Sequence, residues 1–172
     1  MSAVCPNCSQ PAIEKFGDGK LLFITSSPNE EEMHYMKPFS GKNKQIFTSS
    51  LWKYAKIDFN ATASIPLWYH PKSRIKDWTK DACFQVSLEL VLDEIQEHDR
   101  VVLVGADACR WFTGRSIDNV NGMDVTEFVS EELTDGREFF AICSPSTVFT
   151  SQGEFFFALT KLGEWNASSL RS

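Results

Sequence analysis

The sequence predicts an α/β fold, a three-layer α/β/α sandwich in which helices cover both faces of a central, mostly parallel sheet of four strands. Short apolar runs alternate along the chain with longer segments of helical periodicity. The run RVVLVGADA at 100–108 is apolar without alternation and leads into a glycine turn, which is typical of a central parallel strand. A length of 172 residues suits a single domain.

The predicted elements alternate between strand and helix along the chain. In order they are strand 20–25, a helix or helical turn over 39–55, strand 57–63, helix 82–98, a strand that starts at 100 and leads into the glycine turn of 100–108, a helix through 111–112, strand 139–142 and helix 151–163. Helix 82–98 has the clearest pattern, because Val86, Leu90, Val91 and Ile95 recur with a period near 3.6.

Loops of small polar residues accompany the four predicted strands. Their sequences are TSSPN at 25–29, NATAS at 60–64, GADA at 105–108 and CSPST at 143–147. Open α/β sheets bind ligands beyond the carboxyl ends of their strands. We therefore expect these loops to converge on one crevice.

The composition narrows the functional classes. A net charge of −6 and a pI near 5.1 exclude an overall basic surface for nucleic acid, although segment 42–56 holds lysines around Trp52. No apolar run approaches the roughly 18 residues of a membrane span. The first ten residues do not form a secretory signal, and five cysteines argue against a disulfide framework. We expect a cytoplasmic protein.

Several motifs share the spacing of one known family. Cys5 and Cys8 form a C-x-x-C pair near the start of the chain. The matching positions downstream are Pro28, Glu31, 37–39, 41–42, Gln45, VVLVGADACRWFTG at 101–114 and CSPST at 143–147. In this order they resemble the uracil-DNA glycosylase superfamily, closest to its iron–sulfur branch, family four. The resemblance implies one glycosylase-like domain over 1–172, with 1–19 as a metal-binding N-terminal segment.

The resemblance also exposes two departures at the catalytic positions. It places the family's catalytic acid on Ser26 and its catalytic histidine on Ser144. In the family the acid orients water or stabilises cationic sugar character, and the histidine donates to O2 of the departing uracil. A hydroxyl carries no charge, and losing one such stabiliser costs about 10²- to 10³-fold in rate. We therefore expect little excision, with Glu31 as a candidate replacement for the acid.

The base-holding and DNA-contacting positions are retained. Phe39 matches the aromatic residue on which a flipped base stacks, and Asn60 matches the asparagine that reads a pyrimidine edge. Core packing is the alternative role for Phe39, and a strand-end cap is the alternative for Asn60. The residues predicted to contact DNA are Lys42, Lys44, Ser146, Val148 and Phe149. The last two occupy the place of the family's apolar wedge.

A metal site is the remaining implication. The family holds its 4Fe–4S cluster with four cysteines, and Cys5, Cys8 and Cys83 match three of them. The other ligand falls on Ser64, with His70 nearby as an alternative. Zinc held by the three cysteines and His70 is chemically plausible, and a site without metal is the third alternative.

Three functions stay open at this point. The first is a catalytically impaired glycosylase-fold protein that binds single-stranded or uracil-containing DNA, or a replication or repair protein. The second is an active glycosylase that removes uracil or a modified base. The third is a protein-interaction module without DNA binding, which the acidic pI favours. The short chain and the altered catalytic positions fit a viral relative.

Overall fold

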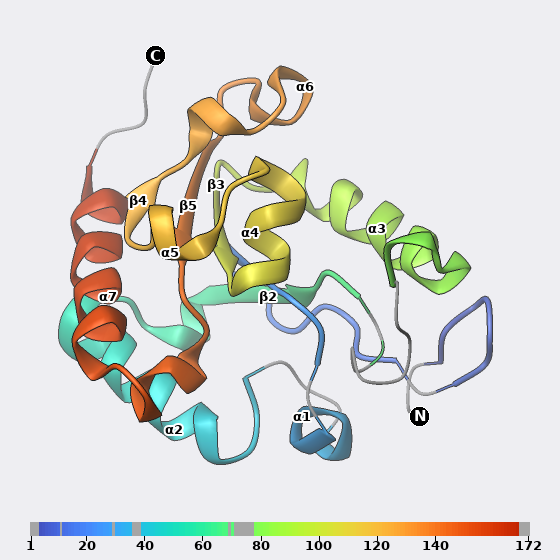
Figure 1. Cartoon of the computed structure of the whole chain (residues 1–172), viewed down its shortest axis with the longest axis horizontal. Coiled ribbons are helices and arrows are strands. Elements are labelled where there is room, and N and C mark those ends of the chain that lie inside the picture. Colours follow the sequence, from blue (N-terminus) through green and yellow to red (C-terminus); the bar gives the residue numbers. More distant parts are fainter. Residues whose placement is uncertain are drawn as a thin grey trace.

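Five strands form one mixed sheet in the order β2-β1-β3-β5-β4 (Figure 1). The strands are β1 (Leu21–Thr25), β2 (Thr62–Pro66), β3 (Arg100–Val104), β4 (Met123–Asp124) and β5 (Glu138–Ile142). The first four in spatial order run parallel, and β4 pairs antiparallel with β5 at one edge. This computed structural model describes residues 4–10, 12–28, 30–35, 39–68, 70 and 78–168.

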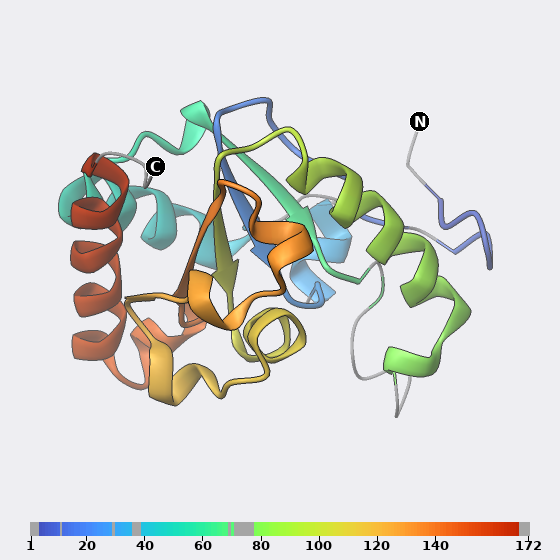
Figure 2. The same cartoon turned by 90° about the horizontal axis from the view of Figure 1, so that it is seen from above.

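Helices pack on both faces of the sheet (Figure 2). Those longer than one turn are α1 (Glu30–Tyr35), α2 (Lys42–Ser50), the π-helical segment η1 (Leu51–Ala55), α3 (Ala82–Ile95), α4 (Ala106–Thr113), η6 (Pro145–Phe149) and α7 (Gln152–Ala167). The short turns are η2 (Phe59–Ala61), η4 (Trp78–Lys80), α5 (Ile117–Val120), η5 (Thr126–Phe128) and α6 (Glu131–Thr134). The predicted α/β class is confirmed.

Two apolar clusters explain why the sheet is covered on both sides. Leu22 and Ile24 of β1 pack with residues of α3 and α4, whereas Leu21 and Phe23 pack with α2, η1 and α7. Successive strand side chains point to opposite faces, so a strand with apolar residues at every position is buried on both. The sheet has five strands rather than the predicted four, because β4 contains only two residues and leaves no sequence pattern.

The second strand begins later than predicted. A strand over 57–63 was expected, but β2 spans Thr62–Pro66. The Asp58 side chain accepts a hydrogen bond from the backbone N–H of Asn60 and caps the turn η2, so the chain turns before the strand starts. Asn60 therefore precedes the strand, and the loop at its carboxyl end begins at Leu67.

The helices follow the predicted order with shifted ends. Helix α2 continues into η1, which ends at Ala55 and is followed by Lys56 in the left-handed conformation. Helix α3 ends at Ile95 rather than 98. Within it Val91 and Ile95 are buried as predicted, but Leu90 is 44% exposed and does not belong to the core. Among the described residues, no helix is both long and apolar enough to cross a membrane.

Candidate metal centre and strand-end crevice

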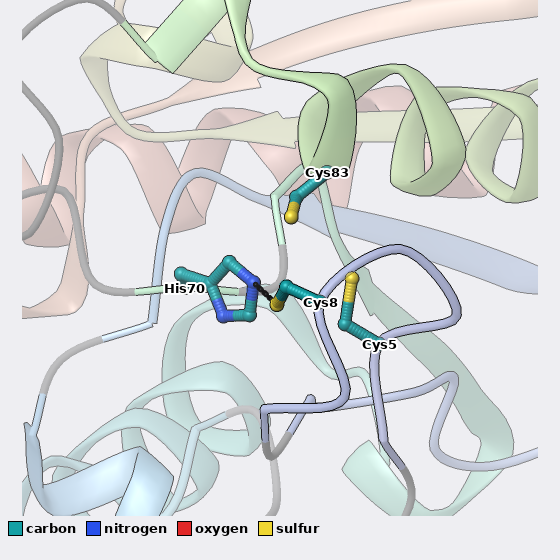
Figure 3. A group of neighbouring side chains, drawn as sticks. All are labelled: Cys5, Cys8, His70 and Cys83. Carbon is teal, nitrogen blue, oxygen red and sulfur yellow. Dashed lines mark hydrogen bonds between the residues drawn. The ribbon is translucent and has the colours of Figure 1, made fainter.

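Three cysteines and one histidine from distant parts of the chain meet beside the start of α3 (Figure 3). Cys5 and Cys8 lie in the N-terminal loop, His70 follows β2, and Cys83 lies in the first turn of α3. Their four potential ligand atoms all lie within 4.8 Å of one another. The Cys8 Sγ is 3.3 Å from the His70 Nε2. The group can hold a metal ion, and its fourth member is His70 rather than Ser64.

Local hydrogen bonds hold the cysteines in place. The N-terminal loop folds back on itself, because the N–H of Cys5 donates to the Gln10 carbonyl and the N–H of Ser9 donates to the Cys5 carbonyl. At the other side, the Asp81 carboxylate caps α3 by accepting the N–H of Cys83 at 2.7 Å. All three bonds are local, within the N-terminal loop or at the first turn of α3.

Burial acts against ionisation of both buried thiols. Burial raises the pKa of the Cys83 thiol to about 12, although a hydrogen bond from Asn7 opposes this rise. Burial also acts to raise the pKa of Cys5, but hydrogen bonds from the backbone N–H groups of Cys8 and Asn7 outweigh it and leave that pKa below the ordinary value. Metals bind the thiolate form, so a bound cation would have to displace the proton of Cys83.

The spacing of the four ligand atoms fits one ion. Around tetrahedral zinc, with Zn–S distances near 2.3 Å, two sulfur ligands stand about 3.8 Å apart. All four atoms in this group lie within 4.8 Å of one another. In a four-iron cluster each ligand binds a different iron at the corner of a cube, which keeps the ligands farther apart than around one ion. A nitrogen ligand also departs from the four-cysteine rule of such clusters.

A separate crevice lies at the carboxyl ends of β1, β3 and β5. Its volume is about 230 Å³, and the lining includes Ser26, Glu32, Phe39, Gly105, Asp107 and Ser144. Three of the four predicted loops therefore converge, as the strand-end rule requires. The fourth segment, 60–64, does not, because it covers the end of η2 and the first residues of β2 and so lies at the amino end of that strand.

Both serines at the predicted catalytic positions use their hydroxyls in hydrogen bonds to the backbone, Ser26 with distant segments and Ser144 with the turn that follows it. The Ser26 hydroxyl donates to the Val104 carbonyl at 3.0 Å and accepts the N–H of Ala108 at 3.1 Å. The Ser144 hydroxyl accepts the N–H of Ser146 and starts η6. Gly105 lies against Ser26, and a Cβ added there would stand 2.8 Å from its Oγ. The Ser26 hydroxyl thus connects the end of β1 to the end of β3 and the first turn of α4, and the Ser144 hydroxyl connects the end of β5 to η6.

Among the described residues two carboxylates line the crevice, and neither was singled out from the sequence. Glu32 accepts the backbone N–H of Phe39 at 2.7 Å, and Asp107 lies at the start of α4. The side chain of Glu31, the predicted replacement acid, lies outside the described residues. A run of three glutamates gives no basis for choosing among them, whereas Asp107 belongs to the GADA loop and the strand-end rule could have found it.

Phe39 is packed in the core, the alternative role considered for it, and it also lines the crevice. Its ring is 4% exposed and stacks on Phe47 at 4.3 Å, with Phe23 and Phe59 edge-on. Its backbone φ of 55° is in the left-handed region, which a bulky residue rarely adopts and which fits a tightly packed turn.

The predicted DNA-contacting residues are divided between two places. In η6, Val148 is buried in the core, while Phe149 is 58% exposed. Ser146 is exposed and lines the crevice. Lys44 and Asn60 instead line a second groove beside Trp52. The Lys42 side chain lies outside the described residues.

Comparisons with known proteins leave the family of this chain open. No protein-family model matches the sequence, and no curated protein matches it. The function has to be inferred from the arrangement of the residues themselves.

Proposed function

We propose that this protein binds single-stranded or uracil-containing DNA at the crevice, on a uracil-DNA glycosylase-like fold that has lost most of its excision activity. The observation that supports this proposal is the position and hydrogen bonding of Ser26 and Ser144. Both lie at the crevice where the family resemblance requires an acid and a histidine. Both hydroxyls are engaged in hydrogen bonds to the backbone, and neither can supply the charge that the chemistry needs.

The position of β2 supports the loss of a third functional group, the asparagine that reads the base edge in the family. In the family motif T-N-V-V-K-C, the base-reading asparagine precedes a cluster cysteine by four residues. If His70 takes the place of that cysteine, the same spacing assigns the asparagine position to Pro66 rather than Asn60. Pro66 ends β2 beside Thr25, at the crevice end of the sheet. A proline side chain has no donor or acceptor for a base edge.

The proposal includes one zinc ion at the group of Cys5, Cys8, His70 and Cys83. Zinc accepts mixed nitrogen and sulfur ligands in tetrahedral sites that contribute directly to folding. The ligand spacing within 4.8 Å favours a single ion over a four-iron cluster. A site with four protein ligands leaves no open position, so the metal has a structural role.

An active glycosylase with altered chemistry is the second candidate, and Glu32 is the observation that favours it. Its carboxylate lines the crevice and lies on the chain segment that leads to Phe39. A carboxylate there could orient water in place of the acid missing at Ser26. Asp107 offers a second carboxylate at the same crevice.

A single-turnover excision assay, with binding measured on the same oligonucleotides, separates these candidates. The substrates are single- and double-stranded DNA with one uracil, and matched DNA without it. We expect binding without release of uracil. Release that disappears in Glu32→Gln would establish the second candidate. The absence of binding at low salt would refute the DNA proposal and favour a protein partner.

A pair of variants tests whether the crevice is the binding site. Phe39→Leu and Phe47→Leu remove stacked rings from the same aromatic cluster, but only Phe39 lines the crevice. We expect Phe39→Leu to weaken DNA binding more than Phe47→Leu does, because loss of a base stack is worth about 1–3 kcal/mol. Equal weakening would mean that binding responds to core packing and not to the crevice.

A further inference from the structure

We propose that a second groove, on the outer face of α2 and η1, binds single-stranded nucleic acid, with one base stacked on Trp52 and a phosphate next to Lys44. The groove has a volume of about 470 Å³. Its lining includes Lys44, Thr48, Trp52, Phe59 and Asn60. The inference rests on the nucleic-acid binding proposed above and adds a site outside the crevice.

Helical spacing forms one wall of this groove. Lys44, Thr48 and Trp52 recur at intervals of four residues, which places them in one row along α2 and η1. The turn η2 forms the opposite wall with Phe59 and Asn60. The row runs from the ammonium group at the start of α2 to the indole ring in η1, so it offers a charged end and an aromatic end.

The groups suited to bind a ligand are not engaged within the protein. The Trp52 side chain is 60% exposed, and its ring makes no aromatic contact with the described residues. The Lys44 ammonium and the Asn60 amide form no ion pair or side-chain hydrogen bond within the same described part of the chain. An exposed indole beside an amide and a cation suits a nucleotide, because every base has a face to stack and polar edge atoms.

Charge favours a polyanion at this place. Segment 42–56 contains four lysines and no aspartate or glutamate, in a chain of net charge −6. Lys53 and Lys56 of this segment are exposed. The carboxylate at the groove belongs to Asp58, and it is engaged in capping η2 through the N–H of Asn60. A local basic segment on an acidic protein attracts phosphates to that segment rather than to the whole surface.

The groove and the crevice lie on two sides of one aromatic cluster. Phe59 lines the groove, Phe39 lines the crevice, and their ring centroids are 5.8 Å apart. Helix α2 begins at Lys42, three residues after Phe39. A strand bound at the crevice can therefore continue past the start of α2 into the groove. Such a path predicts that long oligonucleotides gain affinity from Trp52 and that very short ones do not.

Tryptophan fluorescence tests this inference, with oligothymidylates of about 4 and about 16 nucleotides, the range of common single-strand sites. We expect the longer probe to quench the parent protein and Trp52→Phe to lose that quenching. Trp52→Ala should weaken binding of the longer probe about 5- to 150-fold, the range for one lost base stack. Lys44→Glu should weaken it and lower its salt dependence.

Matched controls lie on α4, on the opposite face of the sheet. Trp111 is also partly exposed, so Trp111→Phe should retain the quenching, and Arg110→Glu makes the same charge change as Lys44→Glu. If Trp52→Ala binds the longer probe as tightly as the parent protein does, the groove proposal is overturned and the crevice proposal is left intact. Failure of the parent to bind any oligonucleotide would overturn both proposals.

Discussion

Metal removal should destabilise this protein, and the geometry indicates where the effect begins. The four ligands connect three segments: the N-terminal loop with Cys5 and Cys8, the chain after β2 with His70, and the start of α3 with Cys83. Unfolding separates these segments, so an ion that binds all four ligands binds the folded state preferentially. Binding of this kind adds directly to the free energy of unfolding.

The expected magnitude follows from mass action. With free zinc at 1,000 times the Kd, the folded state gains about 4.1 kcal/mol. For a chain of this size, 1 kcal/mol changes the melting temperature by about 2–4 °C. Complete chelation should therefore lower the melting temperature by about 8–16 °C. His70→Ala leaves three thiolates and should reduce the difference that chelation makes.

Calorimetry with and without a strong chelator measures this difference, and elemental analysis of the purified protein gives the metal stoichiometry. Cys109→Ala is the control, because Cys109 is buried in α4 and does not belong to the metal group. It should lower the melting temperature by itself and retain the full effect of chelation. A protein that contains no metal and melts at the same temperature in chelator would refute the metal centre.

Two further predictions follow from the packing of α7 and from the acidity of Cys83. A Cβ at Gly163 would lie 2.7 Å from the backbone of Ala55, whereas Gly153 in the same helix has nothing within 4 Å. Urea denaturation should show Gly163→Ala destabilising the fold by about 1–3 kcal/mol and Gly153→Ala stabilising it by about 0.5–1 kcal/mol. Destabilisation by both would contradict the packing. Because burial raises the pKa of Cys83 to about 12, zinc must displace its proton, and zinc affinity should rise at least tenfold per pH unit between about pH 6 and 8. Chelator competition at each pH measures this slope, and a flat profile would exclude Cys83 as a ligand.

The elements that could be predicted from sequence are those with strong local signals. Strands β1, β3 and β5 are continuous apolar runs, and α3 has clear helical periodicity. Strand β2 begins later than predicted because Asp58 introduces a turn that depends on one side-chain hydrogen bond. Cys5 and Cys8 could be chosen from their C-x-x-C spacing, and the family resemblance added Cys83. The sequence could not decide between Ser64 and His70 as the fourth member, because that choice depends on where β2 ends.

The end of β2 decides two assignments at once. Because β2 ends at Pro66, beside Thr25, the chain has four residues in which to reach His70 from the crevice end of the sheet. Leu67 extends the contact with β1 through its N–H to the Thr25 carbonyl, and its own carbonyl accepts the Ser87 hydroxyl of α3. This segment therefore connects the crevice to α3, whose first turn carries a ligand of the metal group. The same position of β2 places His70 in the metal group and Asn60 away from the crevice, so these two placements have one structural cause.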